Sequence, residues 1–215
     1  MSEKTLRLAV LLSGGGRTLE NIAQAIDRGE LDARIVAVIS SKADAYGVIR
    51  AKNLGLPVHV VVRKDYPSPQ MFSEPIWTIL REAGADLVCL CGFLSLITIP
   101  DEYAQRMLNI HPALLPAFGG KGMYGHHVHE AVLAAGCKVS GCTVHFCDQQ
   151  YDTGPIIVQR ACPVRENDTA ETLADRVFDE ECRAYVHAIR LIQQGRVVIE
   201  GRRTRITPTP QNYIG

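Results

Sequence analysis

The stretch "LRLAVLLSGGGR" (residues 6–17) decides the fold. Its first seven residues form an almost continuous apolar run, which is typical of a β-strand covered on both faces. The run ends in Ser-Gly-Gly-Gly, and a helical pattern follows over residues 18–29. A strand, a glycine turn and a helix in this order predict the first unit of an α/β sheet.

Three more apolar segments, at residues 33–41, 56–62 and 85–93, repeat this theme. Helix-like stretches around residues 43–54 and 70–83 separate them. Parallel strands that alternate with helices are joined by right-handed crossovers. The first half of the chain therefore predicts a mostly parallel central sheet with helices on both faces.

The pattern changes after residue 106, and the second half is predicted to be mixed. Its expected elements are a short strand at 106–110, a proline- and glycine-rich loop at 112–125, a helix near 126–136, strands at 139–147 and 154–164, and an amphipathic helix at 168–194. A chain of 215 residues with 47% hydrophobic composition can bury one full core. We therefore expect a single domain.

Composition and charge exclude several classes of protein. Twenty-three basic residues balance twenty-three acidic ones, so no net charge attracts nucleic acid or an anionic membrane. The seven cysteines are odd in number and lie mostly in apolar segments, which suits free thiols in a reducing compartment. No segment has the roughly 18 apolar residues of a membrane helix, and the N-terminus does not match a signal peptide. We expect a cytoplasmic protein that binds neither nucleic acid nor membranes.

The glycine loop after the first strand predicts a phosphate site. Gly14, Gly15 and Gly16 precede a helix, where unpaired backbone N–H groups and the helix dipole attract an anion. A tight turn without a ligand is the alternative. The second strand ends in Ser40-Ser41 rather than an acidic residue, which disfavours NAD, and no Gly-Lys-Ser/Thr closes the loop as in a P-loop. A phosphomonoester on a small substrate fits best.

A second cluster lies in "MLNIHPALLP" (107–116). Asn109 and His111 are two residues apart in a strand, so both point to one side at the carboxyl edge of the sheet. Two such N–H donors would stabilise an oxyanion, as acyl transfer requires. Asp152, before Thr-Gly-Pro, could meet His111 and raise the fraction of it that is protonated. The alternatives are a turn cap for Asn109, a structural histidine for His111 and a turn-forming role for Asp152.

The motifs "SGGG", "CGFLSLI", "NIHPALLP" and "HFCDQQYDTGPII" occur in this order, and with them the chain resembles the folate-dependent formyltransferases from about residue 6 to 195. The resemblance implies a Rossmann-like formyltransferase fold with a phosphate-binding half (1–105), a catalytic and folate-binding half (106–195) and a C-terminal tail (196–215). From its arginines, prolines and polar residues, the part at 202–215 is expected to be a solvated, loosely held end. It also implies transfer of the formyl group of 10-formyltetrahydrofolate, the co-substrate, to the amine of 5-phosphoribosylglycinamide (glycinamide ribonucleotide) in de novo purine biosynthesis. At this length we expect neither the RNA-binding nor the regulatory domain of longer relatives.

The same resemblance assigns roles by position. Asn109 and His111 would stabilise the oxyanion, and Asp152 would orient and charge His111 and help to order a water that relays the proton. The phosphate would be held by Gly14, Gly15, Gly16, Arg17 and Thr18. The rest of the ribonucleotide would contact Pro112 and Glu181. The folate would contact Leu94, Ser95, Leu96, Ile97, Asn109, His145, Asp148 and Tyr151. No arginine stands near residue 69 to hold the folate tail, which leaves Arg63 and Lys64 as substitutes.

Other features do not predict a further cofactor. His126 and Glu130 lie one helical turn apart, but a zinc site needs three or four ligands, and His127 and His129 are expected to point elsewhere. We expect small-molecule substrates, no metal, and a monomer or homodimer. The alternatives are a folate-dependent formyltransferase for another amine, a formyltetrahydrofolate hydrolase, and a binding module for nucleotide or folate that has lost the reaction.

Overall fold

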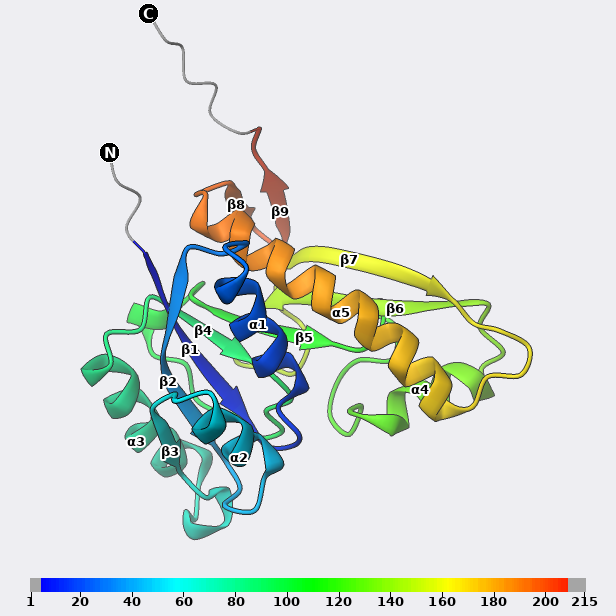
Figure 1. The fold of residues 1–215 in the computed structure, drawn as a ribbon. Helices are drawn as coiled ribbons and strands as arrows, with labels where there is room; N and C mark the ends of the chain where they lie inside the picture. Colours follow the sequence, from blue (N-terminus) through cyan, green and yellow to red (C-terminus); the bar gives the residue numbers. More distant parts are fainter. Residues whose placement is uncertain (1–4, 209–215) are drawn as a thin grey trace, which may run out of the picture.

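The computed structural model describes residues 5–208, which form a seven-stranded sheet in the order β3-β2-β1-β4-β5-β6-β7 (Figure 1). The strands are β1 (Leu6–Leu12), β2 (Ala33–Ser40), β3 (Val58–Val60), β4 (Leu87–Leu90), β5 (Met107–His111), β6 (Val139–Phe146) and β7 (Ile156–Pro163). β1 to β5 are parallel, whereas β6 and β7 pair antiparallel with their neighbours. The predicted α/β fold with a mixed second half is confirmed.

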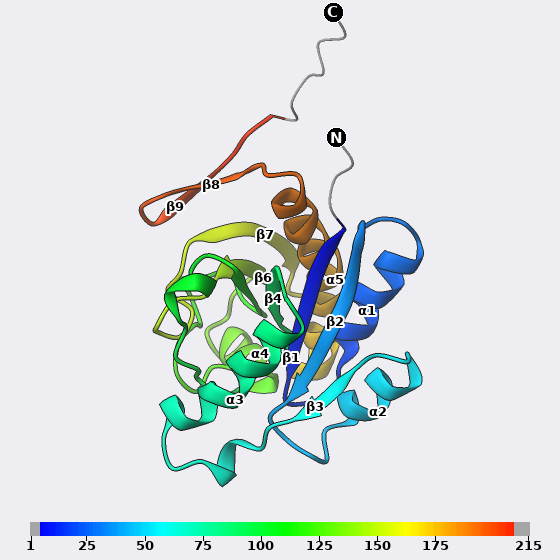
Figure 2. The same ribbon diagram turned by 90° about the vertical axis from the view of Figure 1, so that its left-hand side faces the viewer.

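Helices cover both faces of this sheet. They are α1 (Arg17–Asp27), α2 (Tyr46–Asn53), α3 (Pro69–Glu82), α4 (His126–Ala134) and α5 (Ala170–Gln193), with short 3-10 turns at Arg63–Asp65 and Asp101–Tyr103. Alternate side chains of β1 divide between two cores: Leu8 and Val10 pack with α1 and α5, whereas Ala9 and Leu11 pack with α3. Figure 2 shows α1 and α5 on one side of the strands and α3 on the other. Burial on both sides explains the continuous apolar run of β1.

The C-terminal segment differs from the sequence-based expectation. Residues 196–215 were expected to be a C-terminal tail that is loosely held from residue 202, but β8 (Val197–Glu200) and β9 (Arg203–Ile206) form an antiparallel hairpin. The Thr204 hydroxyl donates to the Ile156 carbonyl at 2.6 Å, which ties the hairpin to the edge strand β7. β8 carries the partly buried Val197 and Ile199, which pack against the core, whereas β9 is mostly exposed and carries two arginines. A run of three apolar residues is shorter than the roughly four to eight that predict a strand. Residues 209–215 of that prediction lie outside the described residues.

Within residues 5–208, none of the helices combines the length and apolar character required to span a membrane. All seven cysteines are free thiols. Burial raises the pKa of Cys89 to about 12, against a hydrogen bond from Tyr185 that lowers it. A thiol held in this form is a poor nucleophile.

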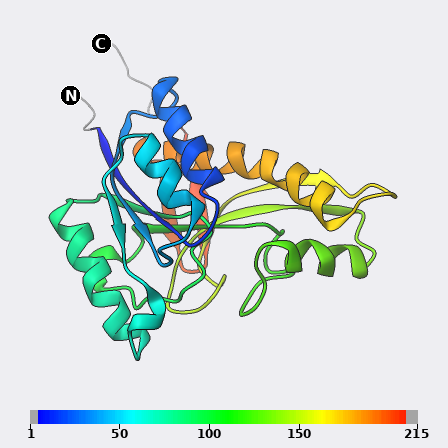
Figure 3. The same cartoon turned by 60° about the horizontal axis from the view of Figure 1, so that its bottom comes forward.

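The neighbouring parallel strands β4 and β5 are joined to α5 through one side chain. The hydroxyl of Tyr185, which is fully buried, lies 3.0 Å from the Leu90 carbonyl oxygen of β4 and 3.2 Å from the Leu108 carbonyl oxygen of β5. Figure 3 shows α5 running along the sheet toward α4. This contact fixes the two strands whose ends carry the site described next.

Candidate active site

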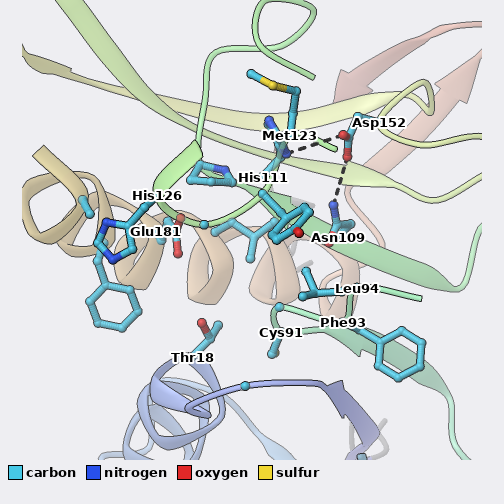
Figure 4. Close-up of a pocket in the computed structure, with 18 of the residues that line it drawn as sticks. Thr18, Cys91, Phe93, Leu94, Asn109, His111, Met123, His126, Asp152 and Glu181 are labelled. Atoms are coloured by element: carbon cyan, nitrogen blue, oxygen red, sulfur yellow. Dashed lines mark hydrogen bonds and ion pairs between the residues drawn. The ribbon is translucent and has the colours of Figure 1, made fainter. Parts of the chain in front are cut away.

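A cavity of about 580 Å³ opens at the carboxyl edge of the sheet (Figure 4). Its walls come from five segments that are distant in the sequence: the glycine loop after β1, the residues after β4, the end of β5, the loop that leads into α4 and the loop between β6 and β7. One side is closed by α5, through Ala174, Phe178 and Glu181. The cavity therefore lies where open α/β sheets bind ligands.

The glycine loop forms one end of the cavity, and all five predicted phosphate-binding residues line it. Gly16 begins α1 at φ 75°, and a Cβ there would lie 2.7 Å from the Cα of Gly47, so only glycine fits. A Cβ on Gly14 or Gly15 would meet nothing within 4 Å. The N–H groups of these three glycines donate to no residue in 5–208. The loop thus presents free donors to open space, as a phosphate site requires.

Arg17 lies at this end but is already engaged by α5. Its guanidinium stacks over the ring of Phe178 at 3.8 Å, and Nη1 is 3.1 Å from Oδ1 of Asp175. Thr18 is buried beside it. The backbone of the loop, rather than the charge of Arg17, is therefore the main element that faces an anion.

Asn109, His111 and Asp152 meet at the opposite end of the cavity. Asp152 Oδ1 accepts from Asn109 Nδ2 at 3.3 Å, and Oδ2 lies 3.5 Å from His111 Nδ1. Oδ2 also accepts from the Gly120 N–H at 2.9 Å. His145, paired with Asn109 across β5 and β6, places Nε2 3.2 Å from Asn109 Nδ2. The structure brings together the three side chains that the sequence predicted to converge.

The protonation of this cluster differs in part from the prediction. Burial lowers the pKa of His111, and although Asp152 and the Phe118 carbonyl raise it, the net shift is downward. Burial raises the pKa of Asp152, but the hydrogen bond from His145, the charge of His111 and the Gly120 N–H outweigh it, so the net shift is downward. The carboxylate does favour the charged imidazole as expected, but desolvation has the larger effect.

The hydrogen bond of His111 to the backbone fixes its tautomer. Nε2 lies 2.7 Å from the Phe118 carbonyl oxygen, and because a carbonyl only accepts, Nε2 carries the proton. The uncharged ring therefore still has an N–H donor at Nε2. In this conformation the donor points at the loop carbonyl of Phe118.

A narrower pocket of about 60 Å³ adjoins this corner. The predicted folate residues Ser95, Leu96, Ile97, Asn109, His145, Asp148 and Tyr151 line it, whereas Leu94 lines the larger cavity. The two hollows share Phe93, Asn109, Tyr151 and Asp152. Asn109 and Asp152 thus stand where the hollows meet, which is the position needed to act on a group passing between two substrates.

Comparison with known proteins assigns the chain to a family. The family described as Formyl transferase matches residues 6–189. The chain belongs to the formyl transferase family. It is 42% identical over 194 residues to the chloroplastic phosphoribosylglycinamide formyltransferase of Arabidopsis thaliana, covering 89% of this chain and 66% of that protein. It is 34% identical to phosphoribosylglycinamide formyltransferase of Haemophilus influenzae, covering 89% of each chain.

Solved structures agree with this family. The crystal structure of glycinamide ribonucleotide transformylase 1 from Symbiobacterium toebii matches with a TM-score of 0.89 and 42% identity, covering 97% of this chain and 100% of that one. A formyltetrahydrofolate deformylase from Pseudomonas syringae matches at 24% identity, a TM-score of 0.83 and coverage of 95% of this chain and 67% of that one, which shows the shared fold alone. The chain spans 66% and 62% of the plant relatives from Arabidopsis thaliana and Vigna unguiculata.

In this family member, one wall of the pocket depends on residues that the sequence did not single out. Thr98, after β4, is held by α3: its carbonyl accepts from the Trp77 indole at 2.7 Å, and its N–H donates to the Ser73 hydroxyl at 2.9 Å. The Gln149 amide donates to the Ile99 carbonyl at 2.9 Å and so joins this wall to the Asp152 loop. The sequence contains little indication of the Gln149 contact, because a glutamine in a polar loop usually faces solvent.

Glu181 and Pro112, the two predicted ribonucleotide contacts, both line the larger cavity. Burial raises the pKa of Glu181 to about 7, although the charge of Arg17 lowers it. Arg63 and Lys64, considered as substitutes for holding the folate tail, line neither hollow, and Arg63 Nη1 donates to the Tyr66 carbonyl at 2.7 Å. Glu181 and Pro112 therefore lie in the cavity, whereas Arg63 and Lys64 lie outside both hollows.

The loop before α4 and the start of α4 supply cavity residues that the sequence analysis missed or misplaced. Lys121 and Tyr124 line the cavity, and so do His126 and His129. The expectation that His129 points elsewhere is wrong, because residues three apart on a helix share a face. His127 does point away and lies 3.4 Å from Glu130. Within residues 5–208, no group of three metal-binding side chains is present.

Proposed function

We propose that this chain transfers the formyl group of 10-formyltetrahydrofolate to the amine of 5-phosphoribosylglycinamide, a step of de novo purine biosynthesis. The observation that carries the proposal is the position of Asn109 and Asp152 at the junction of two hollows, with His111 beside Asp152 in the larger one. One hollow has a backbone cradle for a phosphate, and the other is a narrow, mostly apolar pocket. The names of the plant and bacterial relatives support the same reaction.

The residues of the junction have separate roles in this proposal. When the amine attacks the formyl carbon, the formyl oxygen gains negative charge. Asn109 Nδ2 and His111 Nε2 donate to that oxygen, and the loss of one such donor typically costs about 3 kcal/mol in the transition state. Asp152 accepts from the Asn109 amide and the Gly120 N–H, which holds it beside His111. Its ionised carboxylate then orders the water that passes the amine proton to N10 of the folate. The tetrahedral intermediate collapses as the bond from the formyl carbon to N10 breaks, which leaves the formylated amine and releases tetrahydrofolate.

The two substrates occupy different hollows. The phosphate lies on the N–H groups of Gly14 to Gly16, and the ribonucleotide extends past Glu181 and Pro112 toward Asn109. The pterin ring of the donor enters the pocket between Leu96, Ile97 and the Asp148 loop. Asp148 is held for this role, since it accepts from the Thr153 hydroxyl at 2.7 Å and the Gln150 N–H at 2.9 Å.

A donor-dependent absorbance assay with a panel of amines tests the proposal. We expect turnover that requires both 10-formyltetrahydrofolate and glycinamide ribonucleotide. Formate release without any amine would instead indicate a formyltetrahydrofolate hydrolase. Turnover with another amine, but not with glycinamide ribonucleotide, would identify that amine as the formyl acceptor. Tight binding of either ligand without turnover would indicate a binding module. The cytoplasmic location and the monomeric or homodimeric state stay predictions.

A further inference from the structure

The loop that carries Asp152 is bonded on one side to the C-terminal hairpin. At the tip of the hairpin, Arg202 Nη2 donates to the Thr153 carbonyl at 3.2 Å, and the Thr204 hydroxyl of β9 donates to the Ile156 carbonyl at 2.6 Å. Thr153 follows Asp152 directly, and Ile156 is the first residue of β7. The hairpin, which lies beside β7 in Figure 2, therefore holds the chain just after the catalytic carboxylate.

The backbone of this loop has a conformation that needs such support. Asp152 has φ 59°, in the left-handed region that residues other than glycine rarely adopt. Gly154 packs so closely on β6 that a Cβ there would overlap the Phe146 carbonyl oxygen. A backbone in a sparsely populated conformation persists only where the surrounding contacts over-determine it. The hairpin supplies two of these contacts from outside the cavity.

The Asp152 side chain tolerates little movement of the loop. Its carboxylate lies 3.3 Å from Asn109 Nδ2 and 3.5 Å from His111 Nδ1, which is already the long end of the range for hydrogen bonds. A displacement of roughly half an ångström would break both contacts. A shift of about 1 Å at a catalytic group can cost up to about 10²-fold in rate. The position of the loop backbone therefore controls whether Asp152 can act.

We propose that the β8–β9 hairpin positions Asp152 for formyl transfer, with Arg202 and Thr204 as positioning residues that act through the carbonyls of Thr153 and Ile156. This inference rests on the proposed function. The two bonds fix the chain on either side of Gly154-Pro155, and so the direction in which it leaves Asp152. Neither Arg202 nor Thr204 lines either hollow of the described chain, so their effect on the rate passes through the loop.

Variants of Thr204 test the proposal through kcat and KM. Thr204→Val removes the hydroxyl and keeps the shape of the side chain. We expect kcat to fall about tenfold while the KM for the ribonucleotide stays within about twofold. Thr204→Ser, which keeps the hydroxyl, should recover most of this loss. An unchanged kcat for Thr204→Val, or a Thr204→Ser variant no better than Thr204→Val, would overturn the inference.

The matched control is a threonine that bonds only within the hairpin region. The Thr207 hydroxyl donates to the Arg196 carbonyl at 3.2 Å, away from the Asp152 loop. Thr207→Val should lower the urea midpoint about as much as Thr204→Val and leave kcat at the wild-type value. A loss of kcat in Thr207→Val equal to that in Thr204→Val would show that the hairpin acts only through general stability.

Arg202 gives a second, independent measurement at the tip of the hairpin. Arg202→Met removes the donor, and because this bond is exposed and longer, we expect kcat to fall only about threefold. Arg202→Lys can still donate to the Thr153 carbonyl and should restore the rate. Arg205 pairs with Glu200 inside the hairpin at 2.8 Å, so Arg205→Met should not change kcat. Equal losses in Arg202→Met and Arg205→Met would contradict the proposal.

A double variant shows whether the hairpin acts through the carboxylate. Once Asp152→Asn has removed the charge, Thr204→Val should lower kcat by less than about twofold, because the group that it positions is already lost. A tenfold fall in both backgrounds would show that the hairpin acts independently of Asp152. A wild type that does not transfer the formyl group would refute the proposed function. An active wild type with unaffected Thr204 and Arg202 variants would refute this inference alone.

Discussion

The two ends of the cavity are built in different ways. The glycine loop presents backbone N–H groups, and its geometry is set by one residue at positive φ and by the close approach of Gly16 to Gly47. The catalytic corner presents side chains from β5, β6 and a loop, which exchange hydrogen bonds with one another. The difference implies that changes in the loop affect substrate affinity and folding, whereas changes in the corner affect the chemical step.

Asp152→Asn should give the largest effect, a fall in kcat of about 10²–10³ with little change in the KM for the ribonucleotide. Asp152 has φ 59°, which asparagine tolerates, so the loop should keep its path while the carboxylate charge is lost. Steady-state kinetics check this. Asp179→Asn, at an exposed site on α5, is the matched control and should leave kcat unchanged. A rise in KM alone would assign Asp152 to binding.

Glu181→Gln should change how stability depends on pH. Because burial raises the pKa of Glu181 to about 7, the folded state binds more protons than the unfolded state between the ordinary value of 4.5 and about 7. Its contribution to stability is therefore complete below about pH 4.5 and is lost as the pH rises through about 7, by about 3 kcal/mol. Urea unfolding at pH 5 and pH 8 measures the loss. If the wild type and Glu181→Gln lose the same stability, the carboxyl is not desolvated as described.

Gly16→Ala should lower the free energy of unfolding by about 2 kcal/mol, because the new Cβ meets backbone and the residue keeps a positive φ. The KM for the ribonucleotide should rise while kcat changes little. Gly15→Ala is the matched control for stability, since its Cβ enters open space. Urea midpoints compare the two. Equal stability of both variants would show that the close approach to Gly47 does not constrain the loop.

Lys121→Met should have the smallest effect, a rise of about threefold in the KM for the ribonucleotide. Lys121 is an exposed cation of the cavity with no ion pair to any described residue, so its attraction for an anionic substrate is screened by salt. The rise should shrink as the salt concentration increases. Lys138→Met, which removes a surface lysine paired with Glu166, should show neither effect. A salt-independent rise would indicate a contact other than charge.

The sequence predicted most strongly where one residue pattern has one structural meaning. The apolar run of β1 required burial on both faces, and the spacing of Asn109 and His111 placed both at the same edge. It failed where the outcome depends on how distant segments pack. The residue at which α4 begins decides which helix face His129 occupies, and so whether it lines the cavity. The net pKa shift of His111 depends on the desolvation that packing produces. Gln149 acts through a partner fifty residues away, which no local pattern contains.

The measurement that tests the central claim most directly is the single-turnover rate of formyl transfer by His111→Ala, with both substrates saturating. Saturation removes binding from the comparison, so the rate reports the chemical step. If His111 Nε2 donates to the oxygen as it gains charge, the rate should fall about 10²-fold or more. A rate within about tenfold of the wild type would contradict the account.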